Sequence, residues 1–371
     1  MGGPLRVALV EPYLGGSHQA WAEGYRAASH HDVEIVSHPA RFWKWRMQGA
    51  HVTLADAFRA AVDRAGPYDV ILAGSMLHLP AFLGMVRDLT PVPPVAVYLH
   101  ESQLTYPLSD RDRPDEAYAM INWTSALVAD LVIFNSSYHR RVFFEEAGSF
   151  LGRFPDHKHT SKLAAVRDRA EVFPVGVDLR RFDGVAPAAA TAPVILWNQR
   201  WEYDKGPAAF AEAITALAAS GHDFRVIMTG ERFVGQPGEF EALPAVLGDR
   251  LVHFGFAEDD VYRALVAAAD IVVSTAEQEF FGVAITEAMY AGAFPLLPDR
   301  LVYPERLPER HHEACLYADG ELCGRLELAI GDLSECRKVG AELRRHVAGL
   351  DWEHIAPAYD DRLARLVADG A

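Results

Sequence analysis

Short runs of β-branched and aliphatic residues recur along the chain, and most are followed by a longer stretch with helical spacing. In the first half these runs are RVALV, DVEIV, DVILA, PVAVYLH, DLVIFN and EVFPVG. Helices are predicted between several of them, including residues 115–129 and 136–147. Strands that alternate with helices indicate a parallel sheet covered on both faces. The alternation therefore predicts an α/β fold of the doubly wound class.

The same pattern starts again after DGVAPAAATAP, residues 183–193, whose small Pro- and Ala-rich composition predicts a linker. The second set of runs is VILWN, DFRVIMTG, LVHFGF, DIVVST and AFPLLP. A chain of 371 residues is long enough for two such domains. We predict Rossmann-like domains over 1–185 and 191–350 and a C-terminal helix over 351–371. Ligands of such domains bind in the cleft at the carboxyl ends of the strands.

Composition narrows the class of protein. No apolar run approaches the roughly 20 residues of a membrane span, and LRVALV is too short for a signal sequence, so we predict a cytoplasmic protein without a membrane segment. Cys315, Cys323 and Cys336 form no CxxC pair, which indicates reduced thiols. The net charge of −16 argues against non-specific coating of nucleic acid but permits a local basic patch.

A glycine turn follows the first strand. Gly15 and Gly16 allow close approach to the backbone, and Ser17 is predicted to cap the helix that follows. Such a turn can bind an anion at the helix start, although it is no GxGxxG motif, and a tight βα turn without a ligand explains it as well. His18, just past the turn, would face the site or cap the helix.

Two cations open the second domain. Arg200 and Lys205 lie in WNQRWEYDKG, directly after its first strand. A guanidinium fork together with a point cation suits a pyrophosphate, and a solvated basic loop is the alternative.

Two glutamates follow a later strand in EFFGVAITE. Glu279 is predicted in the loop, Gly282 and Val283 at the start of the helix, and Glu287 in its second turn. A helix N-terminus favours a phosphate, and a carboxylate can accept hydrogen bonds from sugar hydroxyls. Carboxylates are rarely buried without partners, so two salt-bridged acids are the alternative.

RFWKWR, residues 41–46, interleaves cations with aromatic rings. Stacked nucleobases with phosphates nearby suit such a segment. The alternative is a half-buried strand or loop whose tryptophans pack the first domain. A second basic run at 152–169 is explained equally well by a solvated helix face.

The order of the glycine turn, the Arg/Lys pair and the Glu-x7-Glu pair resembles the retaining glycosyltransferases with two Rossmann domains, the GT-B type. The chain further resembles the tRNA-queuosine mannosyltransferase family, in blocks that run from residue 15 to residue 305: GGSH, RFWKWRMQGA, SML, HESQLTYP, ADLVIFNSSYHR, WNQRWEYDK, STAEQEFFG and RLVYPE. It departs from that pattern at Ser102, where the family has Asn, and at Gln199 and Gln278, where it has His.

This resemblance implies a metal-independent enzyme that takes mannose from GDP-mannose and transfers it to the cyclopentenediol of queuosine in a tRNA anticodon. Glu279 would face the hexose, Glu287 the ribose, and His100 would orient the hexose. Arg200 and Lys205 would neutralise the departing diphosphate. The remaining donor-binding residues would be Gly15, Gly16, Phe281, Gly282 and Val283. The acceptor-binding residues would be His18, Trp43, Lys44, Trp45, Arg46, Glu101 and Gln103.

Two other functions stay open at this point. A nucleotide-sugar enzyme of the same fold with a small-molecule acceptor is favoured by the acidic charge and by Gln199 and Gln278. A non-catalytic RNA-binding module is disfavoured by the complete set of Arg200, Lys205, Glu279 and Glu287. The sequence predicts no oligomeric state.

Overall fold

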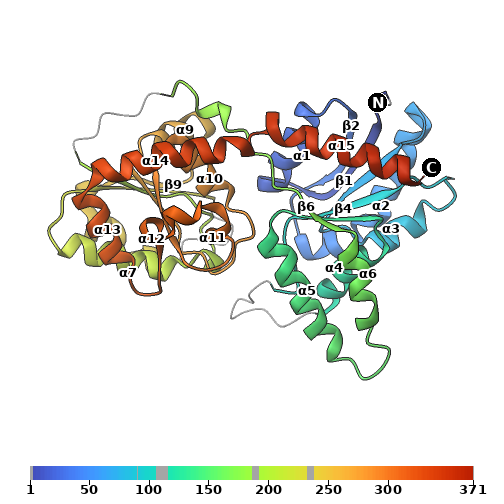
Figure 1. The fold of residues 1–371 in the computed structure, drawn as a ribbon, viewed down its shortest axis with the longest axis horizontal. Helices are drawn as coiled ribbons and strands as arrows, with labels where there is room; N and C mark the ends of the chain where they lie inside the picture. The colour runs from blue at the N-terminus through green and yellow to red at the C-terminus, as the bar shows by residue number, and fades with distance from the viewer. Residues whose placement is uncertain (1–2, 90, 106–115, 186–191, 232–237, 371) are drawn as a thin grey trace. The chain divides into compact units, whose positions relative to one another are not determined.

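The structure, a computed structural model, describes residues 3–89, 91–105, 116–185, 192–231 and 238–370. The chain divides into two compact units. Unit 1 comprises Met1–Val177 and Trp352–Ala371, and unit 2 comprises Asp178–Asp351. Each unit is an α/β layer structure (Figure 1).

Unit 1 contains a six-stranded parallel sheet in the order β2-β1-β3-β4-β5-β6. The residues of the inner strands β1, β3, β4 and β5 are almost all buried, as expected where helices cover both faces of a parallel sheet. The strands are β1 Arg6–Leu14, β2 Asp32–Pro39, β3 Val70–Gly74, β4 Val95–Leu99, β5 Leu131–Phe134 and β6 Ala170–Val172. The helices are α1 Gly16–Ala28, α2 Trp43–Ala65, α3 Leu79–Met85, α4 Glu116–Val128, α5 Ser137–Gly152, α6 Leu163–Asp168 and α15 Trp352–Gly370.

The last helix of the described chain, α15, is part of unit 1. Tyr25 on α1 donates a hydrogen bond of 2.7 Å to Asp360 on α15, and both groups are buried. Trp352 at the start of α15 packs against Gly176, where an added Cβ would lie 2.2 Å from the indole ring. Two stretches of sequence separated by the whole of unit 2 therefore build one core.

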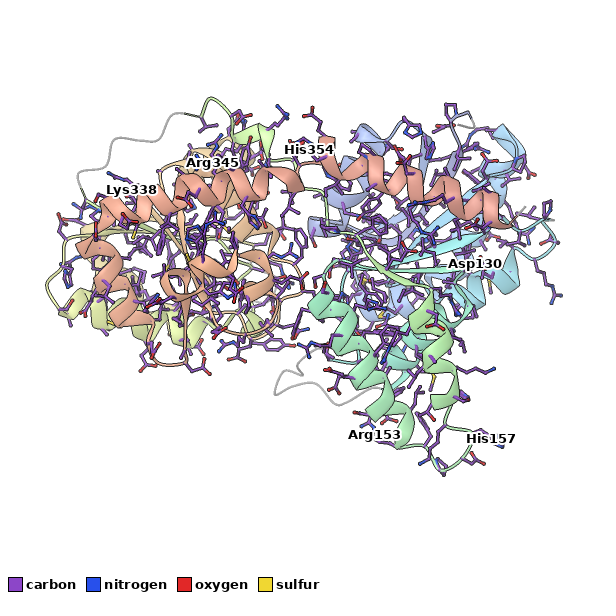
Figure 2. The ribbon with its side chains drawn as sticks, in the orientation of Figure 1. Asp130, Arg153, His157, Lys338, Arg345 and His354 are labelled. Atoms are coloured by element: carbon purple, nitrogen blue, oxygen red, sulfur yellow. The ribbon has the colours of Figure 1, made fainter. Side chains whose placement is uncertain are left out.

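Unit 2 repeats the architecture with a six-stranded parallel sheet in the order β12-β11-β10-β7-β8-β9. Side chains fill the space between each sheet and its helices (Figure 2). The strands are β7 Val194–Trp197, β8 Arg225–Thr229, β9 Leu251–Gly255, β10 Ile271–Val273, β11 Phe294–Pro298 and β12 Leu316–Tyr317. The helices are α7 Pro207–Ala219, α8 Leu243–Leu247, α9 Asp259–Ala267, α10 Val283–Ala291, α11 Tyr303–Arg306, α12 His312–Cys315, α13 Leu322–Gly331 and α14 Leu333–Val347.

The predicted doubly wound α/β class is confirmed in both units, and the predicted runs overlap β1 to β11, although EVFPVG shares only Glu171 and Val172 with β6. The prediction that Ser17 caps α1 is wrong. The N-cap is Gly15, without a side-chain hydrogen bond, and Ser17 lies inside the first turn. The central residues of the predicted linker, 186–191, lie outside the described residues. Among the residues that the structure describes, no helix combines the length and apolar character needed to cross a membrane.

Candidate functional site

Two loops meet at the carboxyl edge of the unit 2 sheet. Residues 198–206 follow β7 and residues 274–282 follow β10, and these two strands are paired neighbours. Gly206 brings the loops into contact, because its φ is +61° and an added Cβ would lie 2.2 Å from the carbonyl oxygen of Thr275. Lys205, directly before this glycine, is thereby placed against the loop that carries Glu279.

Lys205 is buried among acceptors. Its Nζ donates to the Gln278 carbonyl oxygen at 2.8 Å and lies 3.2 Å from Oε2 of Glu279 and 3.3 Å from Oδ2 of Asp204. Arg200 lies 3.5 Å from the same Asp204 carboxylate, and its side chain is 44% exposed. The predicted Arg/Lys pair is therefore assembled around one buried acid, Asp204, which the sequence analysis did not single out.

Glu279 is held by the backbone as well as by Lys205. Its Oε1 accepts hydrogen bonds from the N–H groups of residues 280, 281 and 282 at 3.1, 3.2 and 3.0 Å. Burial alone would raise the pKa of Glu279, but Lys205 and these N–H donors outweigh burial and lower the pKa below its ordinary value. Glu279 is thus an ionised carboxylate with a fixed direction at the start of α10.

Glu287, in the second turn of α10, faces different partners. Its Oε1 accepts from Nη2 of Arg181 at 2.7 Å, and its Oε2 accepts from the Tyr262 hydroxyl at 2.7 Å. Burial raises the pKa of Glu287 despite these partners. The structure therefore gives the two glutamates separate surroundings, and neither Arg181 nor Tyr262 was predicted from the sequence.

A cluster of ionisable side chains also lies at the carboxyl edge of the unit 1 sheet. His18 on α1 and His100 after β4 are both sequence-predicted, and their ring centroids lie 4.2 Å apart. Glu11 on β1, which was not predicted, places Oε2 3.2 Å from Nδ1 of His18. Within the described part of the chain, one group of three His, Cys, Asp or Glu side chains could hold a metal ion, because their possible ligand atoms all lie within 4.8 Å of one another. Its members are Glu11, His18 and His100.

His100 is enclosed by aromatic rings. The Trp21 ring lies 4.5 Å from its centroid and the Tyr98 ring 4.7 Å. Burial, followed by the neighbouring His18 and His139, lowers the pKa of His100 well below its ordinary value, so the ring is neutral at physiological pH. Asn135 donates to the His100 carbonyl oxygen at 2.9 Å, which fixes the backbone of this residue.

The other predicted acceptor residues in HESQ lie beside His100. Gln103 donates from its side chain to Glu101 at 3.3 Å, and its backbone N–H donates to Asn122 at 2.8 Å. Ser102, one of the departures from the family pattern, is buried and accepts from the Leu104 N–H at 3.2 Å. Tyr106 and Pro107 of the same block lie outside the described residues.

RFWKWR spans the start of α2 and exposes its rings. Phe42 is 77% exposed and Trp45 is 61% exposed, whereas Trp43 is 36% exposed and lies 5.2 Å from the Tyr118 ring. Lys44 places its Nζ 5.4 Å from the Trp43 ring centroid. The prediction of a strand or loop is wrong for residues 43–46, which begin a helix. Trp43 still packs against Tyr118 of the first domain, whereas Phe42 and Trp45 present their rings at the surface.

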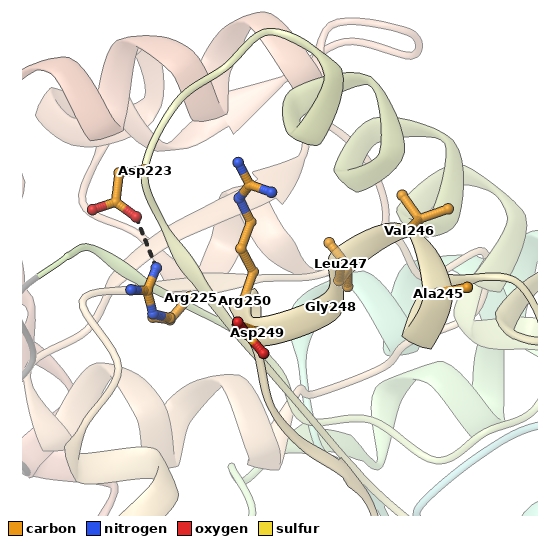
Figure 3. A pocket seen from close by; sticks show the side chains of 8 residues that line it. All are labelled: Asp223, Arg225, Ala245, Val246, Leu247, Gly248, Asp249 and Arg250. Atoms are coloured by element: carbon orange, nitrogen blue, oxygen red, sulfur yellow. Dashed lines mark hydrogen bonds and ion pairs between the residues drawn. The ribbon is translucent and has the colours of Figure 1, made fainter.

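An open pocket of about 400 Å³ lies elsewhere on unit 2, between Asp223, Arg225 and residues 245–250 (Figure 3). Arg225 begins β8 and residue 250 directly precedes β9, so the pocket belongs to the amino edge of the sheet. Arg225 is paired with Asp223 at 2.7 Å. None of the predicted site residues lines this pocket.

Both halves of the chain match models of known protein families. The family model described as tRNA-queuosine alpha-mannosyltransferase N-terminal matches residues 6–177, and the model described as glycosyl transferases group 1 matches residues 181–316. The chain is 34% identical over 318 residues to the tRNA-queuosine alpha-mannosyltransferase of Drosophila melanogaster, and the match covers 82% of each chain.

Solved structures share the fold at low identity. Sucrose-phosphate synthase from Thermosynechococcus elongatus superposes with a TM-score of 0.73 at 18% identity, covering 98% of this chain and 100% of that chain. A glycosyltransferase from Rickettsia africae superposes with a TM-score of 0.69 at 14% identity, covering 98% and 99%. At these identities the likeness shows the two-domain α/β architecture alone.

Proposed function

The chain belongs to the tRNA-queuosine alpha-mannosyltransferase family and is a glycosyltransferase, and we propose that it transfers mannose from GDP-mannose to queuosine in a tRNA anticodon with retention of configuration. The observation that carries the acceptor assignment is the exposed aromatic and basic start of α2, residues 41–46. Exposed rings beside cations are a stacking platform for unpaired bases.

Unit 2 supplies the donor site in this proposal. Arg200 and Lys205 bind the diphosphate and stabilise the charge that develops on it as the glycosidic phosphate bond breaks. Glu279 is ionised and directed by three backbone N–H groups, so it can accept hydrogen bonds from hexose hydroxyls. Glu287 binds the ribose, since each carboxylate oxygen that Arg181 and Tyr262 already contact can accept a further hydrogen bond.

The proposed reaction uses no metal ion, because Arg200 and Lys205 would supply the positive charge that stabilises the departing diphosphate. Gly282 donates its N–H to Glu279, so at the start of α10 the Val283 N–H would be the further donor to anionic oxygens, as would those of the Gly15–Gly16 turn in unit 1. The support for this role is positional: both segments follow the carboxyl ends of parallel strands, where α/β proteins bind ligands.

Unit 1 supplies the acceptor site. Trp43 and Trp45 would stack bases while Lys44 and Arg46 contact phosphates, which position the RNA without reading its sequence. His18, Glu101 and Gln103 would contact the queuosine, and neutral His100 can exchange hydrogen bonds with hexose hydroxyls. A tRNA acceptor and the buried free thiols of Cys315 and Cys336 support a cytoplasmic location.

The test is transfer of labelled sugar to tRNA that carries queuosine, with queuosine-free tRNA of the same sequence as control. GDP-mannose is expected to label only the modified tRNA, and UDP-glucose, supplied in parallel, is expected to label neither. The Glu279→Gln variant should bind GDP like the wild type and lose transfer. Labelling of neither tRNA, together with transfer to a small hydroxylated molecule, would instead support the alternative that Gln199 and Gln278 favour.

A further inference from the structure

Glu11 is a buried carboxylate inside an apolar strand. It lies on β1 after four residues that are fully buried, and Glu11 itself has no exposed surface. Ionisable groups are rarely found at such positions without a function or a partner. Its Oε1 accepts the N–H of Tyr13 at 3.0 Å, and its Oε2 lies 3.2 Å from Nδ1 of His18. Across the described residues, Oε2 accepts no hydrogen bond, so its contact with Nδ1 of His18 is electrostatic.

A glycine on the neighbouring strand leaves room for this carboxylate. Gly74 ends β3, the strand that pairs with β1, and an added Cβ at Gly74 would lie 2.1 Å from Oε2 of Glu11. Any other residue at this position would displace the carboxylate from His18. The neighbouring strand end is therefore matched to the position of Oε2.

The ring of His18 is restrained on its other side. It lies against His100 with centroids 4.2 Å apart, and Trp21 and Tyr98 in turn contact His100. A carboxylate beside one ring nitrogen and an aromatic wall along the ring together define which nitrogen faces outward.

We propose that Glu11 is a positioning residue, which keeps the His18 proton on Nδ1 so that Nε2 can accept a hydrogen bond from the acceptor hydroxyl. The inference rests on the proposed function, because it assigns His18 to the acceptor. A carboxylate oxygen 3.2 Å from Nδ1 favours the tautomer with its proton there, and the lone pair is then on Nε2. The oxygen of the hydroxyl held in this way is directed by the hydrogen bond.

Glu11→Gln is the decisive variant, since it keeps the side-chain volume against Gly74 and removes the charge. Transfer to queuosine tRNA should fall in kcat by roughly a hundredfold, the lower end of what a positioned proton acceptor contributes. GDP affinity and the slow hydrolysis of GDP-mannose by water should stay at wild-type values. Nitrogen NMR of His18 should change from the tautomer with Nδ1 protonated to a mixture.

Glu34→Gln is the matched control. Glu34 lies on β2 opposite Ala8 of β1 and is paired with Arg6, so it is an ion-paired acid of the same sheet away from His18. Its substitution should leave transfer and the His18 spectrum unchanged. If Glu11→Gln fails to fold, Gly74→Ala tests the same geometry, because the added methyl displaces Oε2 and should reduce transfer equally.

Wild-type transfer by Glu11→Gln with an unchanged His18 tautomer would overturn the inference. So would activity that a chelator removes and Zn²⁺ restores, because Glu11, His18 and His100 would then be metal ligands. A wild-type protein that labels no queuosine tRNA would instead overturn the proposed function, and the inference would fall with it. Normal wild-type transfer without any effect of Glu11→Gln overturns the inference alone.

Discussion

Lys205 and Arg200 serve the same ligand in the proposed reaction but differ in burial, and this separates their expected phenotypes. Lys205→Ala leaves Asp204, which is 1% exposed, without its buried cation, so we expect the free energy of unfolding to fall by about 3 kcal/mol. Arg200→Ala removes a half-exposed side chain and should change stability by less than about 0.5 kcal/mol.

Both variants should lose affinity for GDP, because each removes a charge-assisted contact worth roughly 1.5 to 3 kcal/mol. Urea unfolding and calorimetric titration with GDP measure the two effects separately. Lys205→Ala combined with Asp204→Asn should recover stability but not affinity. Unchanged GDP affinity in Arg200→Ala would show that the diphosphate lies elsewhere.

Two buried imidazoles make stability depend on pH. Burial lowers the pKa of His139 to about 3 and also lowers the pKa of His100 well below its ordinary value. In the unfolded chain both rings take up a proton near pH 6.5, whereas in the folded protein they stay neutral. The stability that these two neutral rings contribute is therefore fully present above that pH. It is lost as the pH falls from about 6.5 toward the pKa values of the rings in the folded protein.

The free energy of unfolding is expected to fall by about 1.4 kcal/mol per pH unit for each imidazole. Urea unfolding at about pH 7.5 and about pH 5.5, above the ordinary range of carboxylates, measures this slope. The His139→Gln variant keeps an amide that can donate to Asn135 and should show a slope smaller by one proton. Equal slopes in the two proteins would mean that His139 is protonated in the folded state.

The sequence pointed to candidate residues in loops after strands, such as Arg200, Lys205 and Glu279, and the structure brings these three side chains together. Sequence reasoning missed Glu11, Arg181 and Tyr262 for a physical reason. Glu11 interrupts an apolar strand, and Gly74, the glycine that makes room for it, is reached only through the pairing of β1 with β3. Arg181 and Tyr262 meet Glu287 across 106 and 25 residues of sequence, and no local pattern records such contacts.

At the scale of elements, the start of α2 should act as an RNA-binding surface and not as part of the core. Trp45→Ala should lower tRNA affinity by about 1 to 3 kcal/mol and leave the melting temperature nearly unchanged, because the ring is 61% exposed. Val52→Ala, an exposed apolar residue on the same helix, is the control and should affect neither. Tm and tRNA titration on both variants provide the measurement.

The Lys44→Ala variant tests the phosphate contact of the same element. It should reduce the slope of log affinity against log salt by about one, while GDP affinity stays unchanged. Arg46 is a weaker choice, since its guanidinium already donates to the Pro39 carbonyl oxygen at 3.3 Å. A wild-type salt slope in Lys44→Ala would place the RNA away from α2.

The helices and strands that could be predicted are those long enough to show a hydrophobic periodicity. The runs that form β1 to β11 are apolar and bounded by turns, so their positions followed from pattern alone. β12 has two residues and α11 and α12 have four each, which is too short for any periodicity. The start of α2 was open between strand, loop and RNA-binding segment, because the composition of RFWKWR suits both a half-buried strand and an exposed platform.

At the scale of the whole molecule, unit 1 depends on a helix that follows unit 2 in sequence. Removing residues 352–371 takes away Trp352 and the Asp360 carboxylate that Tyr25 and Ser29 contact at 2.7 and 2.6 Å. We expect hydrogen exchange in α1 and β1 to rise strongly while protection in unit 2 stays at the level of the full chain. Equal loss of protection in both units would show that they fold as one cooperative body.

Gly176→Ala is a milder version of the same test. The added Cβ would lie 2.2 Å from the Trp352 ring, so the helix must shift and unit 1 should lose stability. Gly349→Ala, whose Cβ meets no atom within 4 Å, is the control and should change stability little. Hydrogen exchange, measured separately for unit 1 and unit 2, shows the effect of each variant.

The placement of α15 also bears on how the protein is made. During translation, residues 178–351 leave the ribosome as one continuous stretch that carries all the contacts of unit 2, so this unit can fold while synthesis continues. Unit 1 has been synthesised earlier but waits for α15, with the surface around Trp21 and Tyr25 uncovered in the meantime. A nascent chain therefore passes through a state in which unit 2 is folded and unit 1 is not, and chaperones would meet it at that uncovered surface.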